Sequence, residues 1–211
     1  MHTGILAIWN DCLSEVEKQY EDWYMGQHLP ERVSVPGFRI GRRYQAVAAD
    51  LRYFTFYDTD TPDVLWSDAY RERLANPTLE TAEIMHSFRN MNRTICRRVS
   101  QMGQFVAGHA VTARLSTLPV DAGEIQSTLL NVTGVTGSEA WQAVEVPDAG
   151  ATVESKYRDG PDEAIGAALL FHVMREQDAL DACDMLFQAL GDQAQIGSYQ
   201  LLCELRAESL Q

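Results

Sequence analysis

Two side chains near the start of the sequence have the type and spacing that proton transfer requires. His28 follows Tyr24 by four residues on an apolar stripe with helical spacing, so its imidazole should face the layer beneath that helix. A neutral imidazole can take up or release a proton near pH 7. Glu31 comes three residues later, within reach for orienting the imidazole or stabilising its charge. A histidine of the core or of a helix cap, and a surface position for Glu31, remain as alternatives.

An arginine on a predicted strand could hold an anion. Alternation over residues 37–48 places Arg42 on the same face as Phe38, Ile40 and Tyr44. A guanidinium on an apolar face requires an anionic partner, which is either an internal Asp or Glu or the carboxylate of a substrate. Candidates of the same kind, with weaker support, follow later in the chain: Arg89, Asn90 and Arg93.

Aromatic side chains form a third group of candidates, because they could wall a pocket for a flat unsaturated ligand. They could equally belong to an ordinary core, and they are Trp9, Tyr24, Tyr44 and Tyr53. No H-x-H, H-E-x-x-H or clustered Cys/His spacing occurs in the sequence, so neither a metal site nor another cofactor is expected. The absence of G-x-S-x-G, Walker A and G-x-G-x-x-G motifs argues against α/β-hydrolases, P-loop enzymes and Rossmann dehydrogenases.

The composition of the 211 residues is that of a globular protein, with 45% apolar and 22% charged residues. The formal net charge of -13 would repel nucleic acid and anionic membranes, so neither is an expected partner. No apolar run approaches the roughly 18 residues of a transmembrane helix, and the N-terminus lacks the pattern of a signal peptide. The four cysteines are widely spaced, so a cytoplasmic location with reduced thiols is expected.

The periodicity of the first half predicts the element order β-α-β-β-α-β. Ser14 and Glu17 fit a capping box, so a helix should begin near Glu15, and Pro30 and Pro36 should limit its far end. A second helical pattern covers residues 62–74, and a shorter helical piece lies near residues 79–88. Strands are predicted over residues 4–9, 37–48, 52–57 and 93–99.

The second half predicts the same order, with a loop over residues 147–162 that could form a lid. Its strands are expected over residues 104–116, 138–146, 164–174 and 195–206, and its helices over 121–131 and 176–190. The expected fold class is therefore α+β, with two ferredoxin-like βαββαβ units over residues 1–103 and 104–211. Each unit leaves one sheet face uncovered, and burying the two faces together would form an α/β barrel within one chain.

Two segments of the first half resemble one protein family. Residues 23–44, WYMGQHLPERVSVPGFRIGRRY, are similar to the W-Y-x-x-x-H-L-P-E-R-x-x-x-P-G-F segment of EthD-like proteins and related dimeric α/β-barrel proteins. Residues 75–99 resemble the closing part of the same uncharacterised subgroup. The resemblance implies a ferredoxin-like unit, a barrel of two units and a pocket inside it. It does not fix the reaction, because the superfamily includes isomerases, cyclases, oxygenases, haem-using members and proteins without known activity.

The second half lacks the helix histidine, the H-L-P-E-R run and the F-R-N segment. It is therefore expected to be a degenerate unit, and the one active pocket should come mainly from residues 1–103. Catabolic relatives of the family work without a cofactor, whereas haem is implied by analogy only.

These observations together predict a cofactor-independent isomerase or hydrolase. Its substrate would be a small unsaturated carboxylate, such as a ring-cleavage product of bacterial aromatic catabolism. Arg42, helped by Arg89 or Arg93, would hold the carboxylate, and His28 would move a proton or activate water. One alternative is a cofactor-free oxygenase or cyclase acting on a polyketide-like aromatic, and another is a non-catalytic stress-response protein that binds a small anionic or aromatic-derived molecule. Both a monomer and a homodimer are compatible with the sequence.

Overall fold

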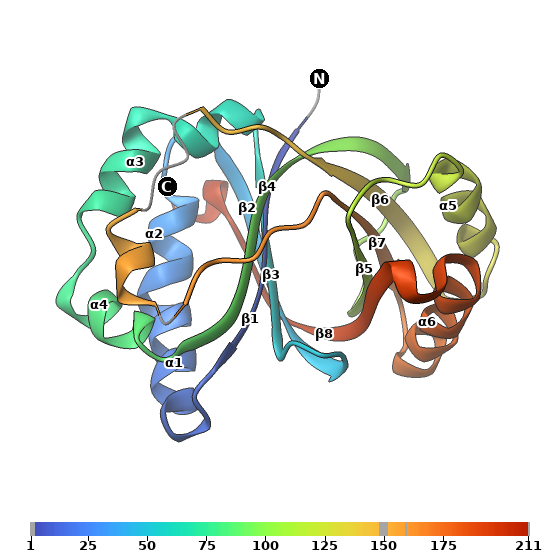
Figure 1. Cartoon of the computed structure of the whole chain (residues 1–211), viewed down its shortest axis with the longest axis horizontal. Coiled ribbons are helices and arrows are strands. Elements are labelled where there is room, and N and C mark those ends of the chain that lie inside the picture. Colours follow the sequence, from blue (N-terminus) through green and yellow to red (C-terminus); the bar gives the residue numbers. More distant parts are fainter. Residues whose placement is uncertain (1–2, 148–151, 159, 211) are drawn as a thin grey trace.

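Eight antiparallel strands close into one barrel in the order β1-β3-β2-β8-β5-β7-β6-β4 (Figure 1). The computed structural model describes residues 3–147, 152–158 and 160–210. The apolar segments of the sequence form the strands, some as continuous apolar runs and others with a two-residue alternation. They are β1 Gly4–Cys12, β2 Phe38–Ala48, β3 Tyr53–Thr59, β4 Phe88–Gly103, β5 His109–Leu115, β6 Val135–Ala143, β7 Ala167–Val173 and β8 Ala194–Arg206.

The barrel consists of two four-stranded sheets that share both of their edges. The strands of the first half pair as β4-β1-β3-β2, and those of the second half pair as β8-β5-β7-β6. The sheets join where β2 pairs with β8 and where β4 pairs with β6. The expected α+β barrel within one chain is therefore confirmed. Closure also leaves no unpaired sheet edge along this ring of strands.

Helices cover the outside of the barrel on two opposite sides (Figure 1). Those of the first half pack over β1–β4, and those of the second half pack over β5–β8. Among the described residues, no helix is long and apolar enough to cross a membrane. The α-helices are α1 Glu17–Trp23, α2 Leu29–Val33, α3 Asp68–Ala75, α4 Leu79–Met85, α5 Ala122–Leu130 and α6 Glu176–Leu190.

The first helical region differs from its prediction at its start, whereas its far end, at Val33, lies between Pro30 and Pro36 as expected. The Ser14 side chain contacts its neighbour Glu15 and caps no backbone N–H, so the capping box is wrong and α1 begins at Glu17, after a 3₁₀ turn. The helix also continues past Pro30, which has no N–H to donate. It does so through a π-helical turn, Tyr24–His28, in which the Leu29 N–H donates to the Tyr24 carbonyl.

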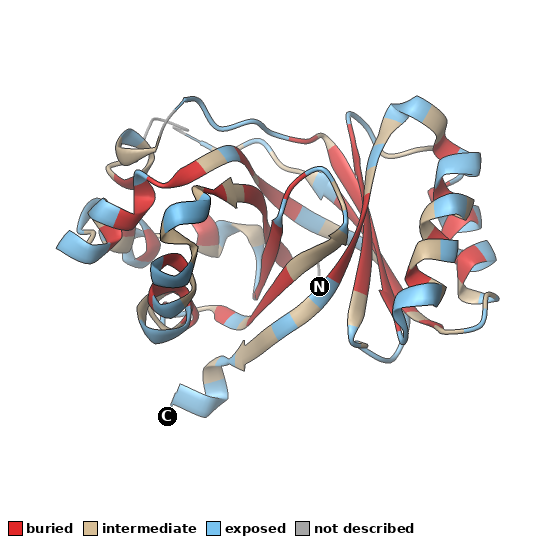
Figure 2. Ribbon diagram, turned by 90° about the horizontal axis from the view of Figure 1, so that it is seen from below, coloured by how far each residue is buried: buried red, intermediate tan, exposed pale blue. Residues whose placement is uncertain are grey.

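The inside of the barrel is a packed core. Trp9 stacks on Phe54 with ring centroids 4.8 Å apart, and Tyr44 stacks on Phe54 at 5.4 Å. Figure 2 shows the strands buried along most of their length and the helices buried only on their inner sides. The expectation of a pocket inside the barrel is therefore wrong, because large aromatic side chains fill that space. They are Trp9, Tyr44, Phe54, Phe56, Trp141 and Tyr199.

One end of the barrel holds a network of buried charges. Glu139 accepts hydrogen bonds from Arg98 Nε at 2.6 Å and from Trp141 Nε1 at 2.8 Å, and His172 Nε2 lies 3.4 Å from its other oxygen. Arg98 also pairs with Asp58. Burial alone would raise the pKa of Glu139, but the hydrogen bond to His172 and the charge of Arg98 outweigh it and lower the pKa from 4.5 to about 2.

Candidate functional site

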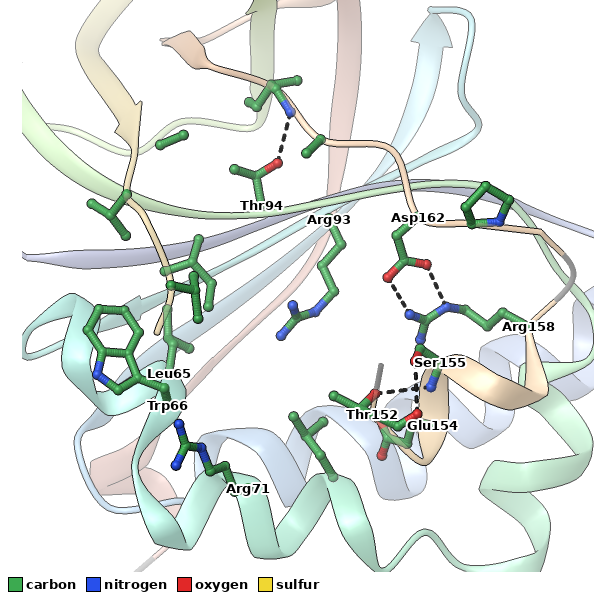
Figure 3. A pocket seen from close by; sticks show the side chains of 18 of the residues that line it. Leu65, Trp66, Arg71, Arg93, Thr94, Thr152, Glu154, Ser155, Arg158 and Asp162 are labelled. Atoms are coloured by element: carbon green, nitrogen blue, oxygen red, sulfur yellow. Dashed lines mark hydrogen bonds and ion pairs between the residues drawn. The ribbon is translucent and has the colours of Figure 1, made fainter. Parts of the chain in front are cut away.

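The large pocket of the described structure lies outside the barrel wall (Figure 3). It has a volume of about 770 Å³, which is in the range of small-molecule sites. Its sides are β4, the 3₁₀ turn Pro62–Trp66 with α3, and the chain that follows β6. Apolar side chains from all three make the walls: Leu65, Trp66, Leu74, Ile95, Val144, Val146 and Ile165.

Hydrogen bonds to β4 hold the far side of the pocket in place. The Arg93 N–H donates to the Glu163 carbonyl at 2.9 Å, and the Glu163 N–H donates to the Met91 carbonyl at 2.7 Å. The Ile165 N–H donates to Thr94 Oγ1 at 3.0 Å. Residues 163–165 therefore run along β4 as an additional short strand-like segment, and this arrangement sets the width of the pocket.

Positive charge gathers in this pocket. Figure 3 shows the Arg93 side chain reaching from β4 into its middle, where Nη2 donates to the Tyr70 hydroxyl at 3.1 Å. Within the described ranges, Arg71, Arg93 and Lys156 have no carboxylate partner. Arg158 is paired with Asp162, its Nε lying 3.0 Å from Oδ1. Arg71 and Lys156 are exposed, whereas Arg93 is half-buried. An apolar pocket around such a cation is suited to a flat ligand that carries or develops negative charge.

A buried ion pair closes the bottom of the pocket. Glu154, in the 3₁₀ turn Glu154–Tyr157, pairs with Arg32 of α2, and both side chains are almost fully buried. The two residues are 122 positions apart in the sequence. The segment 152–158 is thereby attached to the helical layer of the first half, and the Tyr157 ring adds a contact with His86 at 5.7 Å between centroids.

His28 lies just beyond this ion pair, beside a second, much smaller cavity of about 30 Å³. Its ring packs on Trp23 at 4.3 Å and on Tyr24 at 4.9 Å between centroids. Burial, together with the charges of Arg32, Arg43 and Arg158, lowers the pKa of His28 well below 6.5. The imidazole is therefore neutral across the physiological range.

This environment predicts a pH-dependent loss of stability. Below pH 6.5 the unfolded chain binds a proton at His28 that the folded chain excludes. The free energy of unfolding therefore decreases as the pH is lowered. The contribution of this residue is up to about 1.4 kcal/mol per pH unit below that point. Urea unfolding of wild type and His28→Phe at pH 7.5 and pH 5.5 measures it. Between pH 7.5 and pH 5.5, the free energy of unfolding should decrease by about 1.4 kcal/mol more in wild type than in the variant. Equal decreases would contradict the lowered pKa of His28.

Only part of the predicted site comes together. His28 and Tyr24 line the small cavity, and Arg93 lines both cavities. Glu31 is not a partner of His28. Its carboxylate accepts from Gln27 Nε2 at 3.1 Å and lies 3.8 Å from Arg73 Nη1, so it belongs to the surface of the helical layer.

Arg42 is not available to a substrate. A β-bulge between Phe38 and Ile40 moves Phe38 into the helix-facing core, whereas Arg42 and Tyr44 point into the barrel. There Arg42 Nη1 lies 2.8 Å from Asp58 Oδ2, and Nε lies 2.6 Å from Glu204 Oε2. Internal carboxylates therefore satisfy this guanidinium, and the prediction of a carboxylate clamp at Arg42 is wrong.

The remaining candidates have structural partners away from the pocket. Tyr24 and Tyr53 pack against the buried guanidinium of Arg43, whose central carbon lies 4.4 Å and 4.7 Å from their ring centroids. Arg89 Nη1 donates to the carbonyls of His86 and Phe88. Asn90 has a φ of 52° and donates to Asp11 at 2.7 Å. Trp9 and Tyr44 are barrel core, as described above.

Several residues of the pocket have no counterpart in the sequence-based prediction. Trp66 and Arg71 belong to a helical region that the periodicity located correctly, but nothing in the pattern shows that they face a cavity. Glu154, Lys156 and Arg158 lie in the long loop between β6 and β7. The length of this loop is the sequence feature that could have indicated these residues, because loops of more than about 12 residues without regular structure are often functional.

Haem does not fit this site. The iron would need a His, Cys, Met or Tyr ligand, and none of these lines the large pocket among the residues that the structure describes. His28 borders a cavity of about 30 Å³, far too small for a porphyrin. The absence of a cofactor in the reaction stays a prediction from the sequence.

No family model matches the sequence, and no curated protein matches it either. Solved structures do resemble the fold. An anthrone oxidase-like protein aligns with a TM-score of 0.59 and 10% identity, covering 98% of this chain and 93% of that one. A protein from Fusobacterium nucleatum assigned as a monooxygenase aligns with a TM-score of 0.55 and 9% identity, covering 97% and 94%. A protein assigned as a chlorite dismutase aligns with a TM-score of 0.56 and 12% identity, covering 96% of each chain.

At such low identity these likenesses establish the dimeric α+β barrel fold. The names of these proteins also overturn one expectation. They are an oxidase-like protein, a monooxygenase and a chlorite dismutase, and none is an isomerase or a hydrolase. The predicted isomerase or hydrolase reaction is therefore wrong, and the oxygenase alternative fits these neighbours better.

Proposed function

We propose that this protein is a cofactor-free oxygenase that oxidises a flat, polycyclic, polyketide-like phenol of the anthrone type. The observation that carries the proposal is the pocket of about 770 Å³, with apolar walls around Arg93 and two further cations that lack described carboxylate partners. A fused three- or four-ring aromatic matches such walls, and its enolate matches the charge. The anthrone oxidase-like neighbour supplies the reaction class.

The first step of the proposed reaction is deprotonation of the organic substrate, which precedes its reaction with dioxygen. Transfer of a proton from the methylene carbon of an anthrone to solvent water gives a carbanion whose charge is delocalised onto the oxygen, and solvent returns a proton when the peroxide forms. Arg93 and its neighbouring cations stabilise that charge in an apolar environment, where electrostatic interactions are stronger than in water. The pocket thereby lowers the pKa of the bound substrate and makes the anion the prevalent form.

Dioxygen then acts as the oxidant. The carbanion transfers one electron to dioxygen, giving a substrate radical and superoxide, and the two combine into a carbon–oxygen bond. Protonation of the resulting peroxide and loss of water give the quinone. Anthrone and one dioxygen thus yield anthraquinone and one water.

We also propose a family subgroup, a division into two units, a cellular location and an oligomeric state for this protein. The similarity of residues 23–44 and 75–99 to EthD-like proteins supports placing the chain in that subgroup, as a tandem of two units over 1–103 and 104–211. The second half contributes to the pocket through described residues within 143–147, 152–158 and 160–165. A cytoplasmic location and a monomeric or homodimeric state fit the composition, and a small aromatic-derived molecule is the proposed partner.

Dioxygen uptake tests the proposal directly. Purified protein is mixed with anthrone and hydroxyanthrones, and uptake and quinone formation are compared with enzyme-free blanks, because anthrones also oxidise spontaneously. We expect catalysed uptake of one dioxygen per quinone, and one ¹⁸O atom in each product molecule when ¹⁸O₂ is supplied. Rates equal to the blank with every compound, despite ligand-induced thermal stabilisation, would instead favour a binding protein.

A further inference from the structure

The small cavity beside His28 adjoins the large pocket at the Arg32–Glu154 ion pair. The two cavities share four lining residues, Leu74, Arg93, Glu154 and Arg158. The remaining wall of the small cavity is mainly apolar and comes from β1, α4 and the start of β4, with Leu6, Ile8, Met85, Phe88 and Met91. A small molecule could therefore sit behind the bound substrate without displacing it.

Three buried polar atoms next to this cavity have no described hydrogen-bond partner, and one of them is the Tyr57 hydroxyl. The other two, His28 Nδ1 and Arg32 Nη1, are inaccessible to solvent and have no hydrogen-bond partner among the described residues. Both residues line the cavity, and each is less than a tenth exposed. A buried donor or acceptor without a partner costs about 1–3 kcal/mol, so such groups usually mark the place of a ligand or an internal water.

The charges around the cavity favour an anion. Arg32, Arg93 and Arg158 line it together with a single carboxylate, that of Glu154. Glu154 is engaged by Arg32, and Arg158 by Asp162, which leaves the charge of Arg93 without a described counter-ion. An anion formed at this position would therefore be stabilised mainly by the charge of Arg93, and it could accept hydrogen bonds from the free N–H groups of the paired arginines.

We propose that this cavity is the dioxygen site, where superoxide forms during the reaction. This inference rests on the proposed oxygenase function. Dioxygen is apolar and matches the walls, and the one-electron transfer from the substrate carbanion turns it into an anion that accepts hydrogen bonds. His28 and Arg32 are the groups positioned to stabilise that anion. The void of about 30 Å³ also exceeds the roughly 10–15 Å³ that a single water requires.

A pair of matched variants separates this site from the substrate pocket. His28→Phe keeps an aromatic ring against Trp23 but removes both ring nitrogens and fills part of the cavity. His109→Phe is the control, because His109 Nδ1 is likewise buried without a described partner but lies at the start of β5, outside both cavities. We expect His28→Phe to lower kcat/KM for dioxygen at least about tenfold, the effect of one lost hydrogen bond to a charged group.

The dissociation constant of the organic substrate, measured without dioxygen, should be unchanged in His28→Phe, and His109→Phe should match wild type in both quantities. Catalysed oxygenation with an unchanged kcat/KM for dioxygen in His28→Phe would overturn the site and leave the proposed function standing. A weakened substrate dissociation constant would place His28 in the substrate pocket and would also overturn it.

Electron density from wild-type crystals held under dioxygen pressure shows directly whether dioxygen occupies the cavity. This experiment depends neither on catalytic turnover nor on the folding of a variant. Elongated diatomic density in the cavity supports the site even if every tested substrate fails to react. A single spherical water that persists under pressure, or no density, overturns it.

Discussion

Arg93→Met should lower kcat/KM for the organic substrate in dioxygen uptake by about 10²-fold, because it removes the cation closest to the charge that develops during the reaction. The methionine keeps the length of the side chain and adds apolar contact, so binding of the neutral substrate should change little. The measurement is steady-state dioxygen uptake over a range of substrate concentrations. A spectral titration without dioxygen should show less substrate anion in the variant than in wild type, because the substrate pKa rises when the cation is removed.

Arg97→Met is the matched control for Arg93→Met. Arg97 lies four residues further along β4 and is exposed, and it does not line the large pocket. The control should therefore retain wild-type uptake. Equal losses in both variants would show that arginine on this strand acts through stability or overall charge. An unchanged rate in Arg93→Met would remove this side chain from the reaction.

Glu139→Gln should destabilise the fold by about 1–3 kcal/mol, which is a large share of the stability of a domain of this size. The substitution keeps the shape of the side chain but leaves Arg98 with one carboxylate partner where wild type has two, inside the barrel. It also removes the charged acceptor of the Trp141 and His172 hydrogen bonds. Urea unfolding at pH 7 measures the effect, and Glu124→Gln on the exposed face of α5 is the control.

The acid dependence of stability tests the same carboxylate. The folded-state pKa of Glu139 is lowered from 4.5 to about 2, so its contribution is present above pH 4.5 and is lost as the pH falls toward 2. The unfolding free energy of wild type should therefore fall more steeply over this window than that of Glu139→Gln. Parallel curves would show that Glu139 ionises in the barrel as it does in water.

The fold could be predicted because its signals are local. Each strand and helix has its own periodicity, and the order β-α-β-β-α-β occurs twice in the chain. The errors arose where a single residue changes a pattern. The bulge between Phe38 and Ile40 moves Phe38 to the opposite face from Arg42, which strict alternation cannot show.

The site could not be predicted to the same degree, because long-range contacts build it. The partner Glu204 of Arg42 is 162 residues away, and the partner Glu154 of Arg32 is 122 residues away. A sequence shows that a buried guanidinium needs a carboxylate, but it does not show which carboxylate the fold supplies. Helix spacing singled out His28 and Tyr24, and a position on a predicted strand singled out Arg93, as candidates. The segment 152–158 carried no local signal of its position.

The pairing of β2 with β8 has a consequence for synthesis on the ribosome. Because β2 pairs with β8, which is made much later, β2 keeps an open edge until residues 194–206 have been synthesised. Meanwhile the aromatic residues that later fill the barrel, such as Trp9 and Phe54, remain in contact with water on a half-formed sheet. Such a surface is prone to aggregation. Chains stalled before residue 194 should therefore be retained by chaperones, and neither cavity can reach its final form until the second half has emerged.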